Sequence, residues 1–267
     1  MNGRLFRQNL YWFRTRLLIL IVASIAWGLI GPVFYINFSS PLQVLVDSGA
    51  IPSNLLSFGS GSLFTLPGAL TLMLQHPIAI AFMAVFGAAA AATSIAGELE
   101  RGTLETLLAR PLPRRSLYAS TYLAIVVAMA LVMAALLIGQ SISVILLGIS
   151  DEVDLAKMPL VWLNGILLWG AFAAFGMAAS VSFDRSSRAV GLTAGFVLIS
   201  YFLEIIGSLW TDAAFLQDYS LFHYFVPGDV LTGEFNPLGI ALLLAALVIP
   251  IVWALVVFPR RQLPAPA

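Results

Sequence analysis

Long apolar runs separated by short polar segments are the main pattern along this chain of 267 residues. A bilayer core about 30 Å thick is crossed by roughly 20 apolar helical residues. Six runs are long enough to cross it: Leu17–Ile36, Ile78–Ala96, Leu117–Leu137, Leu160–Val181, Ala189–Leu209 and Leu238–Phe258. The pattern therefore predicts an all-α polytopic membrane protein. Its six transmembrane helices form a single domain, residues 1–267, with both termini on one side of the membrane.

Two segments between the predicted spans are long enough to contain structure of their own. Residues 37–77 hold short apolar pieces interrupted by Pro41, Pro52 and Pro67. We expect these pieces at the outer interface, although a re-entrant piece also fits. Residues 210–237 carry several aromatic side chains of the amphipathic kind found at headgroup depth. This composition predicts short outer helices that dip back toward the membrane.

The distribution of charge predicts the orientation. The formal net charge is zero, from 13 basic and 13 acidic residues. Twelve bases and four acids fall on one face of the predicted topology, a net charge of +8, whereas the other face has one base and eight acids, a net charge of −7. Cytoplasmic loops carry an excess of lysine and arginine. The first face, with both termini, is therefore predicted to be cytoplasmic in a multi-pass protein of the plasma (inner) membrane.

Composition and missing motifs exclude several classes of protein. With 60% hydrophobic and 10% charged residues, against about 25% charged in soluble domains, the chain cannot cover a water-facing surface or bind nucleic acid through net positive charge. It has no cysteine, and its two histidines, His76 and His223, are not spaced with acids as metal ligands. The nucleotide-binding pattern G-x-x-x-x-G-K-[ST] is absent. We therefore expect no enzyme activity, metal or cofactor in this chain, and we expect any ATP to be bound by another polypeptide.

The segment after the second predicted span is acid-rich, unlike the other inner segments. The span can continue to about Arg101, and Thr103 is a suitable N-cap for a second short helix. Leu104, Leu107 and Leu108 share one face of that helix. The helix can lie on lipid, or it can dock into a protein. Its neighbouring glutamates suit an anionic inner leaflet poorly, which favours a protein groove.

A family resemblance rests on the same segment. Residues 97–108, with the sequence GELERGTLETLL, and residues 110–114, RPLPR, resemble the segment after the second span of ABC-2-type permeases. These are the membrane subunits of ATP-binding-cassette transporters. The six spans and the basic amphipathic N-terminal segment extend the resemblance over nearly the whole chain. The long first outer segment is similar to the branch that contains the permease of nitrous-oxide-reductase copper-site maturation.

In that family the matching segment is the coupling helix that docks into a cytoplasmic P-loop ATPase, which binds ATP and Mg²⁺. The resemblance therefore implies a coupling segment at residues 97–110. It assigns ATPase docking to these positions: Glu98, Leu99, Glu100, Arg101, Gly102, Thr103, Leu104, Glu105, Leu107, Leu108, Arg110 and Arg114. It also implies an N-terminal elbow helix over residues 1–16, although a basic flank that only sets the topology explains the same residues.

Four polar residues near the outer ends of the spans are candidates for a cavity or gate: Gln140, Ser141, Asn164 and Glu204. Glu204 is the one ionisable residue within a predicted span, where a charge at the bilayer centre costs roughly 2.5 to 3.5 kcal/mol. The alternative role is structural. In that case Glu204 reaches the interface or bonds to Ser200 or Ser208, one turn away.

The pattern Gly191-x-x-x-Gly195 in the fifth predicted span permits a close helix contact. There are two interpretations of this contact. In one, it serves packing within one subunit. In the other, it joins this chain to a second permease subunit, identical or related, as fifth spans do in ABC-2 permeases.

Taken with the resemblance, these features imply the membrane subunit of an ABC exporter, which moves an amphipathic or hydrophobic substrate outward by ATP hydrolysis on a separate subunit. A competing interpretation is a membrane anchor, or an assembly or mechanical-signalling component, that moves no substrate. An intramembrane enzyme is disfavoured, because the predicted spans contain neither paired carboxylates nor histidine.

Overall fold

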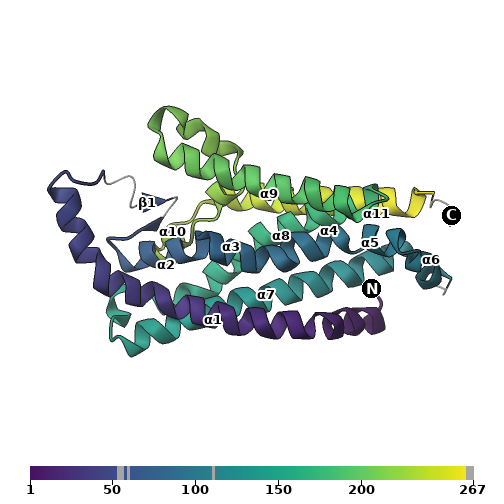
Figure 1. Cartoon of the computed structure of the whole chain (residues 1–267), viewed down its shortest axis with the longest axis horizontal. Helices are drawn as coiled ribbons and strands as arrows, with labels where there is room; N and C mark the ends of the chain where they lie inside the picture. Colours follow the sequence, from purple (N-terminus) through teal and green to yellow (C-terminus); the bar gives the residue numbers. More distant parts are fainter. Residues whose placement is uncertain (53–56, 59–60, 110–111, 263–267) are drawn as a thin grey trace.

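Five long helices dominate the computed structural model, which describes residues 1–52, 57–58, 61–109 and 112–262. They are α1 (Gly3–Asp47), α7 (Arg114–Leu146), α8 (Met158–Ser182), α9 (Ser186–Leu209) and α11 (Pro237–Arg260). These helices lie roughly side by side along the long axis of the molecule (Figure 1). The described residues form a helical protein with one short antiparallel hairpin, which confirms the all-α prediction.

Shorter elements connect the long helices. Between α1 and α7 lie the strands β1 (Ser57–Phe58) and β2 (Gly61–Ser62), then α2 (Leu66–Gln75), α3 (Pro77–Ala84), the π-helix η2 (Val85–Ala90), α4 (Ala91–Thr93), α5 (Ala96–Glu100) and α6 (Thr103–Leu108). After α7 come two 3₁₀ helices, η3 (Ser150–Glu152) and η4 (Leu155–Lys157). Between α9 and α11 come η5 (Thr211–Tyr219), η6 (Phe222–Tyr224) and α10 (Pro227–Thr232).

Five helices in the described part of the chain are long and apolar enough to cross a membrane: α1, Leu155–Ser182, α7, α9 and α11. A further apolar unit consists of α2 and the helical run Pro77–Thr93, which are bent by 49° relative to each other. Counted as one crossing, this bent pair completes the six predicted spans. Both termini then lie at the same end of the molecule (Figure 1).

Helix α1 extends beyond the first predicted span in both directions. Its 45 residues form a helix roughly 68 Å long at 1.5 Å per residue. Residues 4–27 contain neither glycine nor proline, so no helix-breaking residue separates the N-terminal segment from the span. The prediction of a separate elbow helix over residues 1–16 is therefore wrong, because from Gly3 onward these residues are the first turns of α1. At its other end α1 continues through Pro41 into the predicted outer segment.

Helices α1 and α7 pack along each other and run in the same direction. Near their starts, the backbone N–H of Asn2 donates to the hydroxyl of Ser120 at 2.7 Å. Farther along, the hydroxyl of Ser143 donates to the backbone carbonyl of Leu29 at 2.9 Å. Residues of α1 thus meet residues of α7 in the same order.

The crossing of α1 and α7 depends on two glycines. A Cβ on Gly28 would lie 2.3 Å from the carbonyl oxygen of Leu136, and a Cβ on Gly139 would lie 2.3 Å from the carbonyl oxygen of Ile25. Both obstacles are backbone atoms, which cannot move aside as a flexible side chain can. Only glycine at both positions permits this close approach.

The apolar piece before the second span is packed inside the protein, which corrects its predicted place at the outer interface. In α2, Leu66 and Leu70 are buried. Pro67 does not break this helix, because it occupies the first turn, where the missing N–H has no helical partner. The Thr65 side chain caps the helix by accepting a hydrogen bond from the N–H of Gly68. The bent α2–α3 pair has the broken-span or re-entrant form that was the alternative.

The predicted short helices after α9 are present and return toward the middle of the spans. Segment η5 runs back along α9, so that the Ser220 hydroxyl donates to the Ser200 carbonyl at 2.7 Å. The N–H of Leu221 donates to the Ser200 hydroxyl at 2.8 Å. Phe222 then packs edge-on against Trp169 in the interior of α8. Ser220, Phe222 and Phe225 of this segment therefore fill space between spans.

Candidate functional site

The end of the molecule that holds both termini also holds α5 and α6 (Figure 1). Helix α5 ends at Glu100, Gly102 turns the chain with a φ of +69°, and α6 begins at Thr103. Glycine suits this left-handed conformation because it has no Cβ. The predicted N-cap is displaced by one residue: Gly102 occupies the cap position, and the Thr103 hydroxyl donates to the carbonyl and the carboxylate of Glu98.

The leucine face of α6 is turned toward the protein. Leu104 is fully buried, and Leu107 and Leu108 are half-buried. Leu107 lines a hollow together with Leu5 and Trp12 of α1. Leu104 is therefore not available to a partner, whereas docking through the partly exposed Leu107 and Leu108 stays a prediction.

The exposed residues of the coupling segment are mostly polar and include two acids and one base. They are Glu100, Arg101, Gly102, Thr103, Glu105, Thr106 and Ala109. Glu98 and Leu99 are half-buried, and Glu98 forms an ion pair with Arg101. Arg110 lies outside the described residues. Docking of an ATPase to this segment stays a prediction, and the exposed charged and hydroxyl side chains available for it are Glu100, Arg101, Thr103, Glu105 and Thr106.

Two sets of hydrogen bonds link the coupling region to the spans. The Glu100 carboxylate accepts from the Ser186 hydroxyl and from the Ser186 N–H, at the first residue of α9. These bonds hold the pKa of Glu100 below its usual value, and the bond from the Ser186 hydroxyl has the largest effect. Just before α5 and at its start, the N–H groups of Ile95 and Ala96 each donate to the buried Ser180 hydroxyl on α8 at 2.9 Å. The coupling region is therefore hydrogen-bonded to both α8 and α9.

Arg114, predicted at the rim of the docking surface, is used inside the chain. Its guanidinium donates to the backbone carbonyls of Phe258 (3.0 Å) and Arg261 (2.6 Å), at the end of α11. Carbonyls at a helix C-terminus have no helical partner and favour a cation. Arg261 in turn pairs with Asp184. Arg114 therefore joins the start of α7 to the end of α11.

A comparison with known protein families decides the identity of the chain. The model of the family described as ABC-2 family transporter protein matches residues 4–263. The chain belongs to this family. It is a multi-pass membrane permease, the membrane subunit of an ABC transporter, as the resemblance in the coupling segment implied. A comparison with curated proteins found no match. The nitrous-oxide-reductase branch stays a prediction.

The predicted gate residues of the permease make contacts with different segments of the chain, and their role in a gate stays a prediction. The Gln140 amide donates to the Leu70 carbonyl of α2 at 2.9 Å, and the Asn164 side chain accepts from the Val226 N–H at 3.3 Å. Ser141 and Asn164 line two different hollows. Gln140 and Asn164 thus hold connecting segments against the spans. A third residue of this kind, Gln75, could not be predicted, because no sequence motif marks it.

Gln75 and Phe225 tie the two connecting segments of the permease to each other. The buried Gln75 amide at the end of α2 donates to the Phe225 carbonyl at 2.9 Å. These residues lie far apart in sequence and approach only because both segments fold back between the spans. The contact is therefore a product of the tertiary structure.

The carboxylate of Glu204 is fully buried and has partners other than the predicted serines. Its Oε1 accepts a hydrogen bond from the Gln217 amide at 2.9 Å, and its Oε2 lies 3.7 Å from Nδ1 of His223. Ser208 bonds to the carbonyl of Glu204, and Ser200 bonds to the returning segment. Glu204 therefore holds η5 and η6 against α9, and this structural role replaces the predicted bonds to Ser200 or Ser208.

We expect the η5–η6 segment to be held more tightly at acidic pH. Interaction with Glu204 is the main cause that raises the pKa of His223, with smaller contributions from Asp218 and Asp229 and an opposing effect of burial. A raised pKa in the folded state means that protonation stabilises it. The contribution is complete below about pH 6.5, the ordinary pKa of histidine, and is lost as the pH rises through the raised value.

Limited proteolysis between η5 and η6 measures this effect. Cleavage of the permease, relative to cleavage of His223→Gln at the same pH, should become faster as the pH rises. Equal ratios at acidic and alkaline pH would contradict the prediction. Glu204→Gln should keep the bond from Gln217 but lose most of the pH dependence, since only the smaller contributions of Asp218 and Asp229 would remain.

Gly191 and Gly195 face open space on α9. A Cβ at either position would meet no atom within 4 Å. They therefore do not serve packing within the described subunit. Glycines that do serve it include Gly28 and Gly139 at the α1–α7 crossing, which are not spaced as a recognisable pair in the sequence because they lie on different helices.

Proposed function

We propose that the permease forms an exporter with a cytoplasmic P-loop ATPase and moves an amphipathic or hydrophobic substrate outward. The ATPase, in two copies, binds ATP and Mg²⁺, and the permease supplies the path. The observation that carries the proposal is the double link of the coupling region to Ser180 of α8 and Ser186 of α9. A docking segment joined in this way to two spans is suited to transmit force.

In the proposed mechanism, closure of the ATPase subunits pushes α6. The burial of Leu104 resists independent movement of this short helix, so that the spans joined to it tilt. Both termini face the cytoplasm of a plasma-membrane protein in this arrangement, in agreement with the charge distribution. The low number of charged residues in the spans favours an amphipathic or hydrophobic substrate.

We propose further that a second permease subunit packs against α9. Gly191 and Gly195 leave its surface open for a close helix approach. A neighbouring hollow of about 350 Å³ between α3 and α9 is lined by apolar residues such as Ala84, Ala88 and Leu198. Two such surfaces facing each other would create an apolar path along the subunit boundary.

Crosslinking tests the dimer directly, because the chain has no native cysteine. Gly191→Cys and Gly195→Cys should each form a disulfide-linked dimer in membranes under mild oxidation. Ile249→Cys, at an exposed position of α11, is the matched control and should stay monomeric. Crosslinking at Ile249 alone would place the subunit boundary at α11 instead.

Reconstitution tests the exporter. The P-loop ATPase that co-purifies with the permease should hydrolyse ATP faster in liposomes with the permease than without it. A fluorescent amphiphile should then move to the side opposite the ATPase, and only when ATP is present. An ATPase variant that binds but does not hydrolyse ATP is the control. Hydrolysis that is indifferent to the permease, with no movement of the amphiphile, would support the anchor interpretation instead.

A further inference from the structure

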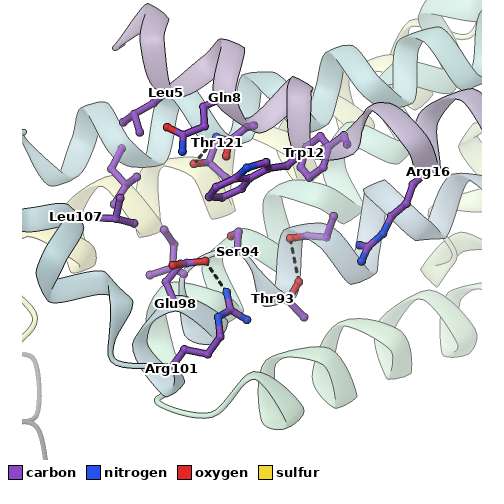
Figure 2. Close-up of a pocket in the computed structure, with 15 residues that line it drawn as sticks. Leu5, Gln8, Trp12, Arg16, Thr93, Ser94, Glu98, Arg101, Leu107 and Thr121 are labelled. Carbon is purple, nitrogen blue, oxygen red and sulfur yellow. Dashed lines mark hydrogen bonds and ion pairs between the residues drawn. The ribbon is translucent and has the colours of Figure 1, made fainter.

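A hollow beside the coupling segment has the chemistry of an anion site at the membrane surface. It lies between the first turns of α1, the region from α4 to α6, and the start of α7 (Figure 2). We call it the α1 pocket. Its volume of about 150 Å³ is below the 300 to 1,000 Å³ typical of pockets that enclose a whole ligand. It therefore suits the headgroup of an amphiphile better than a complete molecule.

One face of α1 forms a wall of the pocket. The residues of this wall are Leu5, Gln8, Asn9, Trp12, Phe13 and Arg16. Their spacing of three and four places them on a single side of the helix. The wall mixes apolar and hydrogen-bonding side chains, although an ordinary helix contact would be apolar. Figure 2 shows Leu5 and Leu107 at one end of the pocket, Arg16 at the other, and Trp12 between them.

The charged groups of the pocket leave one cation unpaired. Glu98 lines the pocket, but it already pairs with Arg101 and accepts a hydrogen bond from Thr103. Among the described residues, no acidic side chain forms an ion pair with Arg16. An exposed guanidinium directed into a pocket is suited to a phosphate, to which it donates two parallel hydrogen bonds.

The position of Arg16 along α1 favours a lipid over a soluble anion as the ligand. It directly precedes Leu17, where the first apolar run begins. On the membrane side of Arg16, Ile19 is exposed and apolar, and its position three residues later places it on the same side of the helix. An acyl chain can lie against Ile19 while the phosphate meets Arg16. Exposed Trp12 is of the type that prefers headgroup depth.

We infer that the α1 pocket binds the headgroup of an anionic phospholipid of the cytoplasmic leaflet, with Arg16 as its phosphate ligand. Basic pockets between spans on this side of a membrane protein suit such headgroups. The lipid would bridge α1 and the coupling segment. This inference does not rest on transport, because binding is measured on the permease itself.

Native mass spectrometry of the detergent-solubilised permease tests the inference. Phosphatidylglycerol is titrated onto the permease and onto Arg16→Gln, Arg16→Lys and Arg7→Gln. Arg7 is the matched control, since it is exposed on the same helix, lies nine positions earlier and therefore points to the opposite side. Arg16→Gln should bind phosphatidylglycerol about tenfold more weakly, because a charge-assisted hydrogen bond is lost. The affinity of Arg16→Lys for phosphatidylglycerol should lie between those of Arg16→Gln and the unmodified permease. The affinity of Arg7→Gln should equal that of the unmodified permease.

Two further arms separate the sources of phosphate. Phosphatidylcholine should bind more weakly than phosphatidylglycerol, and inorganic phosphate should not displace phosphatidylglycerol. Displacement by inorganic phosphate would overturn the assignment to a lipid. Equal binding by Arg16→Gln and Arg7→Gln, with both variants monodisperse, would overturn the role of Arg16.

Discussion

Replacing Gly139 with leucine is expected to remove most folded permease from the membrane. The new side chain would begin 2.3 Å from the carbonyl oxygen of Ile25, so α1 and α7 would have to separate along their length. Because Gly28 makes the reciprocal contact with Leu136, a shift that relieves one clash does not open the other. We expect a loss of more than about 3 kcal/mol of stability, at or above the upper end for overpacked sites. The measurement is the yield of monodisperse protein and its thermal unfolding midpoint in detergent.

Gly191→Leu is the matched control for this experiment. It makes the same chemical change in another long helix, at a position where a Cβ meets no atom within 4 Å. It should therefore leave the yield and the unfolding midpoint of the single subunit nearly unchanged, although it should weaken the proposed dimer. If Gly139→Leu were as stable as Gly191→Leu, the close crossing of α1 and α7 would be wrong.

Placing two arginines on the exposed face of α6 is expected to abolish coupling to the ATPase. Glu105 and Thr106 are both exposed, so Glu105→Arg with Thr106→Arg should not disturb the core. The exchange replaces an acidic docking face by a basic one, and like charges across an interface cost several kcal/mol. We expect the affinity for the ATPase to fall at least about tenfold. Co-purification and permease-stimulated ATP hydrolysis are the readouts.

The control for the α6 variant changes the same residue types at the other end of the protein. Asp151→Arg with Ser150→Arg alters an exposed acid and hydroxyl in η3 and should leave ATP hydrolysis unchanged. Normal coupling in the α6 variant would refute docking at this face. Leu107→Arg would be a less suitable variant for this test, because Leu107 lines the α1 pocket and an arginine there would also disturb packing against α1.

Only part of the structure of the coupling segment could be predicted from its sequence. The position of the break, the second short helix and the shared leucine face were all predictable, because they follow from local spacing and from Gly102. The direction of that face was not. Leu104 is covered by parts of the chain distant in sequence, and the same stripe would suit a partner equally well.

The polar residues of the spans show the same limit. Hydropathy singled out Glu204 because a charge is rare in an apolar run. Its partners Gln217 and His223 could not be predicted, because η5 and η6 meet α9 only through a reversal of the chain. Gln140 and Asn164 were likewise expected around one cavity. In the structure they bind the backbone of separate returning segments.

Glycine spacing was the most misleading signal. Gly191 and Gly195 form a visible pair on one helix, yet both face open space, whereas Gly28 and Gly139 make the close contact. A pair within one helix can be recognised from spacing. A pair across two helices exists only after their register is set.

The amino-acid sequence by itself determined the apolar spans, the separation of charge that predicts the orientation, and the family of the coupling segment. These properties depend on run length, composition and local spacing. The thickness of the bilayer fixes the length of an apolar span, and the basic residues of the loops fix the orientation. The tertiary structure alone decided which face of each helix is covered, where the buried amides and carboxylate find partners, and that Arg16 faces a pocket. Each of these depends on residues distant in the chain, whose approach is set by the packing of whole helices.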